Sequence, residues 1–294
     1  MNTKICDMVT AKILAQLDEG VVPWLRPWVA FGGAISRATG RPYSYLNQMI
    51  LGGSGEWATF NQIRAEGGKV KKGVKSRPVI FWKILGGALK TIEEEGDSIE
   101  VRYRPTPYLT YYPVFNLDDA EGIEPKYIKE ENMPCAVDAD EKADKIAREY
   151  LEREGIRLID GEIRDDAFYR VRADEIQIPH VNQYKSTAEY YSTLFHEIVH
   201  STGADNRLNR KLTYDRSIQR RAQEELVAEI GAAALCALAG VQTPESLKNS
   251  AAYIEHWRNR IAEDNTLVVI AAGRAQKAVE FILQQATMEE EAEI

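Results

Sequence analysis

Apolar residues recur at helical spacing along several stretches of the chain, and elsewhere they gather into short runs. Helical spacing predicts a first helix from Lys4 to Glu19 and a charged amphipathic helix from Asp138 to Glu154. It also predicts three helices near the end of the chain, at residues 221–239, 251–262 and 273–285. Short runs rich in β-branched and aromatic residues predict strands at 79–82, 99–103, 108–115 and 169–178. This mixture indicates an α+β fold.

One further helix has clear signals at both ends. Ser186 is a typical N-cap residue, and Glu189 three positions later completes the pattern of a capping box. An apolar stripe follows at helical spacing, formed by Tyr191, Leu194, Phe195, Ile198 and Val199. Gly203 is a plausible stop. We expect this helix to begin near Ser186 and to end just after His200.

This helix carries the motif His196-Glu197-Ile198-Val199-His200. Residues four apart share one face of a helix, so both imidazoles can bind one metal ion. The protein has only four histidines, which makes a chance occurrence of the motif rare. The motif predicts metal-dependent hydrolysis, with Glu197 as the catalytic base beside the metal. The alternative is an ordinary amphipathic helix with two partly buried histidines.

A third protein ligand is needed, and the next histidine along the chain is distant. The helix predicted at 221–239 offers two carboxylates on one face, Glu225 and Glu229. We favour Glu229 as the ligand because it lies in an otherwise apolar stretch, where an unpaired carboxylate is costly. Glu225 would then hold a ligand imidazole in place. The reverse assignment remains open, as does a solvated helix face. Zn²⁺ is the expected metal, although another divalent transition metal is possible.

Length and charge both indicate two domains. A chain of 294 residues is long enough for two domains, and residues 118–133 form an acidic stretch without hydrophobic periodicity. We place the domains at residues 1–125 and 126–294. Residues 1–117 hold 15 Lys/Arg against 10 Asp/Glu, a net of +5, whereas residues 118–294 hold 22 against 35, a net of −13. No signal peptide or membrane-spanning run is evident, so we expect a cytoplasmic protein without membrane contact.

The basic first half combines the two residue types that hold single-stranded nucleic acid, namely cations for phosphates and aromatic rings for bases. We predict DNA binding by Trp24, Trp28, Tyr43, Lys69, Lys71, Lys72, Lys75 and Arg77. The alternative is a lysine-rich hairpin beside an aromatic core, and some of these tryptophans must belong to the core.

The order of motifs resembles a known family. The first half is similar to the N-terminal domain of ArdC-type antirestriction proteins, at Pro23-Trp24 to Pro27-Trp28, Thr39 to Tyr43, Asn47, Trp57 to Gln62 and Lys72-Gly73. The second half is similar to the zincin-like metallopeptidase domain of the same family, at His196 to His200, Thr202-Gly203, Arg207-Leu208, Glu225 to Glu229 and Tyr253 to Trp257.

This resemblance implies an N-terminal domain that binds single-stranded DNA and a C-terminal domain like a zinc metallopeptidase. It implies protection of incoming plasmid DNA from host restriction during conjugation, with an unidentified protein substrate. A first alternative is a non-catalytic protein that coats single-stranded DNA and has a structural metal. A second is an acidic mimic of DNA that binds the restriction enzyme.

Overall fold

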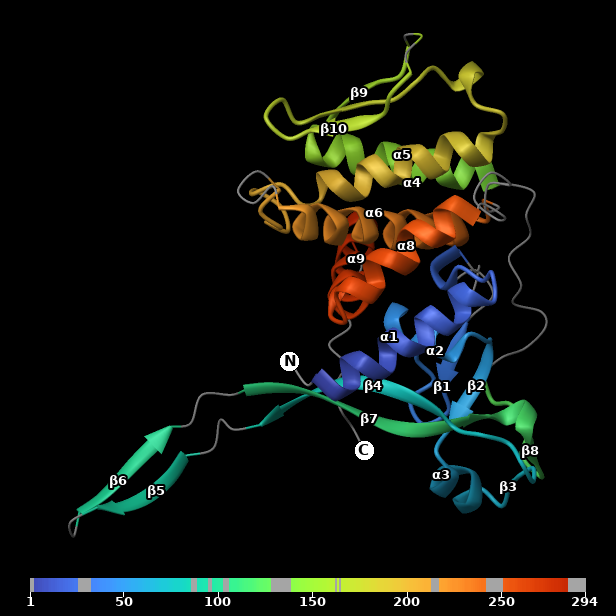
Figure 1. The fold of residues 1–294 in the computed structure, drawn as a ribbon, viewed down its shortest axis with the longest axis vertical. Helices are drawn as coiled ribbons and strands as arrows, with labels where there is room; N and C mark the ends of the chain where they lie inside the picture. Colours follow the sequence, from blue (N-terminus) through green and yellow to red (C-terminus); the bar gives the residue numbers. More distant parts are fainter. Residues whose placement is uncertain are drawn as a thin grey trace.

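The computed structural model describes residues 3–25, 33–85, 89–94, 97–102, 106–127, 139–161, 163, 165–212, 217–241 and 251–284. Helices and strands are mixed along the chain, which confirms the α+β class (Figure 1). Within the described ranges, no helix combines the length and apolarity needed to cross a bilayer.

The first half is built around a small mixed sheet. Its strands lie in the order β1-β2-β7-β4, where β1 and β2 are parallel and the other neighbours are antiparallel. A hairpin of β5 and β6 projects away from this sheet (Figure 1), and β3 pairs with β8. The elements are α1 (Thr3–Asp18), η1 (Pro23–Leu25), β1 (Ala34–Ser36), α2 (Tyr45–Leu51), β2 (Gly55–Ala58), α3 (Phe60–Ala65), β3 (Lys69–Val70), β4 (Arg77–Leu85), β5 (Leu89–Glu94), β6 (Asp97–Arg102), β7 (Thr106–Asn116), η2 (Leu117–Asp119) and β8 (Ala120–Glu121).

The second half stacks helices beneath a three-stranded sheet (Figure 1). The strand order is β10-β11-β9, with β10 antiparallel and β9 parallel to β11. The elements are α4 (Ala139–Glu154), β9 (Arg157–Ile159), β10 (Phe168–Arg170), β11 (Glu175–Gln177), η5 (Val181–Gln183), α5 (Thr187–Ser201), α6 (Ile218–Ala239), α8 (Ala251–Glu263) and α9 (Leu267–Leu283).

Two predicted elements differ from the structure. The single strand predicted at 169–178 is a hairpin, because the chain turns between β10 and β11, with Asp174 at a positive φ of 50°. The helix predicted from Gly273 begins earlier, at Leu267, and runs through that glycine. Gly273 has open space around it, so the packing does not require a break there.

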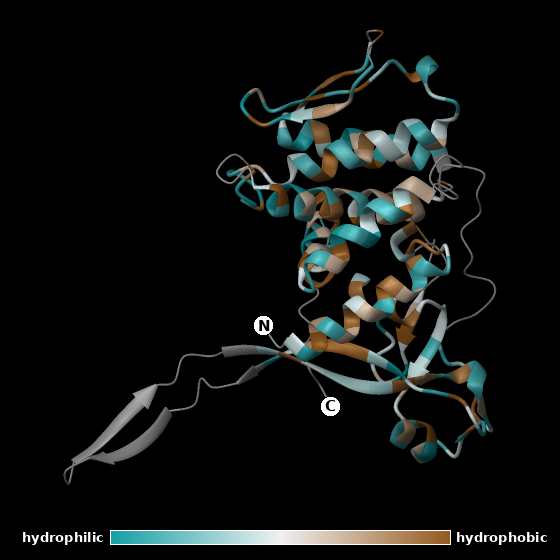
Figure 2. Cartoon of the chain, viewed as in Figure 1, coloured by the Kyte–Doolittle hydropathy of each residue, from teal (hydrophilic) through white to brown (hydrophobic). Residues whose placement is uncertain are grey.

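The two halves share one hydrophobic core. Residues of α1, η1 and α2 belong to the same buried cluster as residues of α6, α8 and α9, and Figure 2 shows hydrophobic stretches along these helices. The Trp24 indole packs edge-on against Trp257 with ring centroids 5.9 Å apart, and its Nε1 donates to the Tyr253 hydroxyl at 3.0 Å. Thr10 Oγ1 also donates to the Asn265 carbonyl at 3.1 Å. The first helix therefore stabilises the second half directly.

Helices α5 and α6 pack against each other at a glycine. A Cβ added at Gly231 would lie 2.8 Å from Val199 Cγ2, which is closer than such atoms approach. Both residues are in the buried interior of the helix pair. Glycine at this position therefore permits the approach that sets the spacing between the HExxH helix and α6.

We predict that Gly231→Ala lowers the free energy of unfolding by about 1–3 kcal/mol, the usual cost of overpacking. Gly273→Ala is the matched control, because it places the same methyl group on a helix in open space. Alanine favours helix there by up to about 1 kcal/mol, so the control should be neutral or stabilising. Chemical denaturation measures both. Equal stability of Gly231→Ala and the parent protein would contradict the packing constraint.

Candidate metal centre

The HExxH helix forms as its end signals predict. It spans Thr187–Ser201, and the Ser186 hydroxyl accepts a hydrogen bond from the Glu189 backbone N–H at 3.2 Å. The Glu189 carboxylate accepts from the Lys185 N–H at 3.1 Å, one residue before the N-cap. The cap fixes where the helix begins, and this in turn fixes the direction in which its histidines project.

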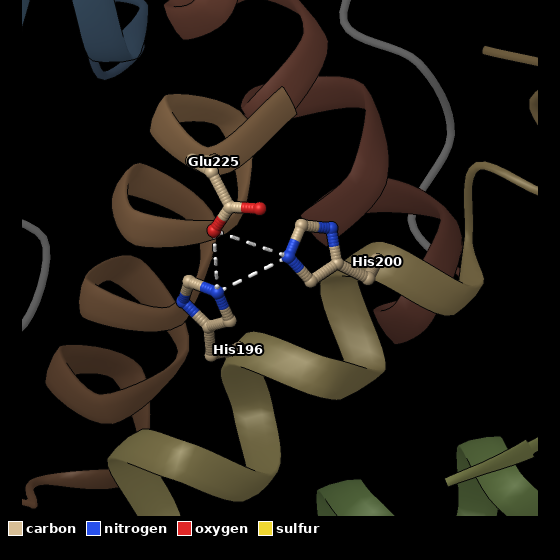
Figure 3. Close-up of side chains that lie close together, drawn as sticks. All are labelled: His196, His200 and Glu225. Carbon is tan, nitrogen blue, oxygen red and sulfur yellow. Dashed lines mark hydrogen bonds and ion pairs between the residues drawn. The ribbon is translucent and has the colours of Figure 1, made fainter. Parts of the chain in front are cut away.

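The imidazoles of His196 and His200 converge with the Glu225 carboxylate, which projects from α6 (Figure 3). The two Nε2 atoms are 3.1 Å apart. Glu225 Oε2 lies 3.4 Å from His196 Nε2 and 3.6 Å from His200 Nε2. Two nitrogens that each lie about 2.0 Å from a tetrahedral ion are about 3.3 Å apart, so this spacing suits a single transition-metal ion.

A half-buried carboxylate orients one of these imidazoles from behind. His200 Nδ1 lies 3.2 Å from Glu224 Oε1, and Arg210 donates to both oxygens of Glu224 at 2.7 and 2.9 Å. Arg210 also donates to the Thr202 hydroxyl and to the Val199 carbonyl at the end of α5. The Glu224 contact directs Nε2 of His200 toward the other two ligands. Sequence reasoning missed Glu224 and Arg210, and the position of Glu224 beside Glu225 was the available signal.

The electrostatics of the three ligands favour a cation. Hydrogen bonds from His196 and His200 lower the pKa of Glu225. Burial lowers the pKa of His200, but hydrogen bonds to Glu224 and Glu225 outweigh it and raise this pKa to about 10. The carboxylates thus hold positive charge at the point where a metal would bind, and a bound metal would replace that proton.

Glu197 lies beside the ligands and is only 6% exposed. Burial raises its pKa, which makes the carboxylate a better proton acceptor. The backbone N–H of Tyr169 in β10 lies near the Glu197 carboxylate and opposes this rise in pKa. Both residues line a pocket of about 450 Å³ that also contains His196 and His200. The motif therefore faces a cavity that a substrate can enter.

Strand β10 presents its open edge to this pocket. Among the described strands, β10 pairs only with β11, so its other side is an open edge, and Phe168 and Tyr169 from this strand line the pocket. Residues 173–179, at the end of the stretch predicted as one strand, do not supply this edge, because β11 lies in the centre of its sheet, between β10 and β9.

Glu229, which the sequence favoured as the third ligand, does not lie beside the two histidines. Glu229 lies one turn beyond Glu225 and accepts a hydrogen bond from the Tyr253 hydroxyl at 2.8 Å. It is not among the side chains that converge on the two histidines in the described ranges. Glu229 does have the partner that its apolar surroundings require, but that partner is Tyr253. The geometry therefore corresponds to the reverse assignment, with Glu225 beside the histidines.

The predicted DNA-binding residues separate into buried and exposed groups. Trp24 is wrong as a stacking residue, because it is 1% exposed and belongs to the core. Tyr43 is half-buried against the cluster around Trp57, and Trp28 lies outside the described residues. Arg77 is exposed, although it lies 5.5 Å from the centroid of Trp57 and donates to the Leu51 carbonyl. The remaining predicted residues are exposed on β3 and in the loop that follows: Lys69, Lys71, Lys72 and Lys75.

Aromatic rings other than the predicted ones reach the surface of the first half. Phe60 is 48% exposed, Trp82 43% and Tyr111 51%. The sequence pattern does not show whether a single aromatic residue in a strand or a short helix is buried. For this reason the sequence did not distinguish these exposed rings from the buried Trp24.

Comparisons with known proteins agree with this architecture. Residues 3–115 match the model of the N-terminal domain of anti-restriction factor ArdC, and residues 145–274 match a zincin-like metallopeptidase model. The metal-free crystal structure of antirestriction ArdC protein from the R388 plasmid is similar at a TM-score of 0.67, with 27% identity over 95% of this chain and 97% of that one. Its Mn(II)-bound structure has a TM-score of 0.69, with 29% identity over 97% and 99%. Together with the ligand geometry, this likeness supports a divalent metal.

Curated relatives include longer proteins. Two proteins named DNA primase TraC, from Escherichia coli, are 31% and 29% identical over 94% of this chain. The chain spans 27% and 20% of their respective lengths. The uncharacterized protein y4eC of Sinorhizobium fredii is 28% identical over 96% of this chain and 92% of its own length. The domain boundary predicted at residue 125 falls between the two matched regions and stays a prediction.

We predict that Glu225→Ala abolishes stoichiometric metal binding and that Glu229→Ala retains about one ion per chain, because Glu225 contacts both histidines. Metal analysis after loading with Zn²⁺ or Mn²⁺ and removal of excess ion measures this. Glu229→Ala should instead lower stability by about 1–3 kcal/mol, since it removes the carboxylate that accepts from the half-buried Tyr253 hydroxyl. Loss of metal mainly in Glu229→Ala would contradict the ligand assignment.

Proposed function

We propose, on the premise that the chain belongs to the ArdC-type family of antirestriction proteins, that it is a metallopeptidase that binds single-stranded DNA and protects incoming plasmid DNA from host restriction during conjugation. The observation that carries the enzymatic part is the convergence of His196, His200 and Glu225 beside the buried Glu197 in one pocket.

The three ligand side chains fit a transition-metal ion by chemistry and by spacing. Two imidazole nitrogens and one carboxylate oxygen are the donor set of many catalytic zinc sites. We therefore propose Zn²⁺ as the metal, with Mn²⁺ as the other candidate because it occupies the related crystal structure. The ion would polarise a substrate carbonyl and activate water.

The protein's own groups account for the remaining steps of peptide hydrolysis. Glu197 takes the proton of the attacking water, for which its burial and raised pKa are suited. The open edge of β10 pairs with an extended peptide and carries it past Glu197. Glu197 then returns the proton to the leaving amine. Arg210 and Glu224 hold His200 in its orientation throughout.

The DNA-binding part rests on the exposed lysines in the first half. They follow the chain from β3 into the loop before β4, which suits contact with successive phosphates. The exposed rings Phe60, Trp82 and Tyr111 are the candidates for base stacking, in place of Trp24. Binding to DNA would bring the protease to proteins on the strand.

We expect Glu197→Gln to retain the metal and single-strand binding but to lose peptide hydrolysis and antirestriction, because it removes only the proton acceptor. Glu255→Gln is the matched control, since it makes the same change at an exposed position of α8, outside the pocket lining. Restriction of a conjugated plasmid in a restricting host measures protection. Full protection by Glu197→Gln would instead favour a non-catalytic protein that coats single-stranded DNA and has a structural metal.

We expect joint replacement of Lys69, Lys71, Lys72 and Lys75 by Gln to weaken binding to an oligothymidylate and to flatten its salt dependence. The slope of log K against log salt should fall by about 0.7 for each phosphate that a lysine no longer neutralises. Replacement of Lys142 and Lys277, which are exposed on α4 and α9, is the control and should leave the slope unchanged. An unchanged slope in the fourfold variant would remove this segment from the DNA interface.

A further inference from the structure

The pocket around the metal ligands is strongly cationic, although it lies in the acidic half of the chain. Five cationic side chains line it against three carboxylates, Glu197, Glu224 and Glu225. The cationic residues are Arg210, Lys211, Arg220, Arg221 and Arg274. A bound divalent metal would add further positive charge. Residues 118–294 have a net charge of −13, so this local excess opposes the trend of its surroundings.

The positions of these cationic residues lower the stability of the fold. Arg220 and Arg221 lie in the first turn of α6, which contains no acidic residue, and cations at a helix N-terminus oppose the helix dipole. Burial and the charges of Arg220 and Arg210 also lower the pKa of Arg274, and they outweigh the opposing charge of Glu224. Repulsion between these arginines is unfavourable unless an anion lies among them, and this suggests that the pocket binds an anionic group.

Arg221 and Arg274 differ from Arg210 in their partners. Arg210 is committed to Glu224 in an ion pair at 2.7 Å. Arg274, from α9, donates to the neutral amide oxygen of Gln223 at 2.5 Å. Within the described ranges, the guanidinium of Arg221 on α6 has no hydrogen bond or ion pair. The pocket thus presents two guanidinium groups, from two helices that pack together, and neither forms an ion pair with a carboxylate of the described residues.

We propose that Arg221 and Arg274 form a specificity subsite for an acidic side chain of the peptide substrate, close to the bond aligned with Glu197. This inference rests on the proposed peptidase function. The open edge of β10 lies on the same pocket and suits an extended peptide backbone. Guanidinium groups pair with carboxylates through two parallel hydrogen bonds, which gives both affinity and selectivity.

The location of the pocket favours a peptide over the bound DNA strand. Strands β9 and β10 lie at one end of the long axis of the molecule, and β3 with α3 lies at the other (Figure 1). The exposed lysines of β3 and its loop are therefore remote from the metal pocket. A second stretch of nucleic acid is the competing occupant, because its phosphates share the negative charge of a carboxylate.

The test uses the full chain with Glu197→Gln, loaded with Zn²⁺, so that bound peptides are not cleaved. A random peptide library displayed on phage is selected on this protein, and the selected peptides are then measured by fluorescence polarisation. We expect enrichment of Asp or Glu at one fixed position. Changing that residue to its amide should weaken binding roughly tenfold, the value of a charge-assisted hydrogen bond.

Arg221→Gln combined with Arg274→Gln should abolish the preference for the acid over the amide. Lys277→Gln, which removes one charge from α9 three residues beyond Arg274 and outside the pocket lining, should preserve it. No acidic enrichment, or a preference that survives the double variant, would overturn the proposal. Displacement of selected peptides by an oligothymidylate, in a chain that also lacks the four lysines, would assign the arginines to nucleic acid instead.

The wild-type protein separates this inference from the proposed activity. Acidic selection by the Glu197→Gln chain without cleavage by the wild type would leave the subsite standing and reject hydrolysis. Cleavage of peptides without any acidic preference would support hydrolysis and reject the subsite.

Discussion

The close packing of α5 on α6 is the interaction on which the site depends. Gly231 allows α6 to lie directly on Val199, and this approach places the Glu225 carboxylate within 3.6 Å of both histidine Nε2 atoms. The same packing brings Glu224 to the rear of His200. Two carboxylates adjacent in sequence thereby act on opposite nitrogens of the same imidazole. A wider gap between these helices would break both interactions together.

The first half of the chain supports this helix pair from the other side. Trp24 donates to Tyr253, and Tyr253 donates to Glu229 on α6, one turn beyond Glu225. The side chains thus form a chain of hydrogen bonds from η1 to the helix that carries Glu225. The matched family models divide the sequence into two regions, whereas the buried cluster crosses between them. The stability of the α5–α6 pair therefore includes contributions from residues of both regions.

The sequence predicted the helices and strands that have strong local signals. It predicted less about residues whose positions depend on tertiary contacts. The cap at Ser186 and the stripe through Val199 sufficed to place the HExxH helix and the direction of its histidines. Glu225 and Glu229 share a helix face, so spacing could not choose between them. The apolar surroundings of Glu229 correctly predicted that its carboxylate has a partner, but that partner is the Tyr253 hydroxyl on α8. In the same way, composition indicated an aromatic surface without showing that Trp24 is core and Tyr111 exposed.

Anomalous X-ray diffraction from zinc-loaded crystals, recorded on both sides of the zinc absorption edge, tests the central claim most directly. The structure predicts one strong peak between His196 Nε2, His200 Nε2 and a Glu225 oxygen, at about 2.0–2.2 Å from each. Glu197 should lie beside this peak without coordinating it. A peak coordinated by Glu229, or no peak at the two histidines, would contradict the assignment of the α5–α6 pair as the scaffold of a metal centre.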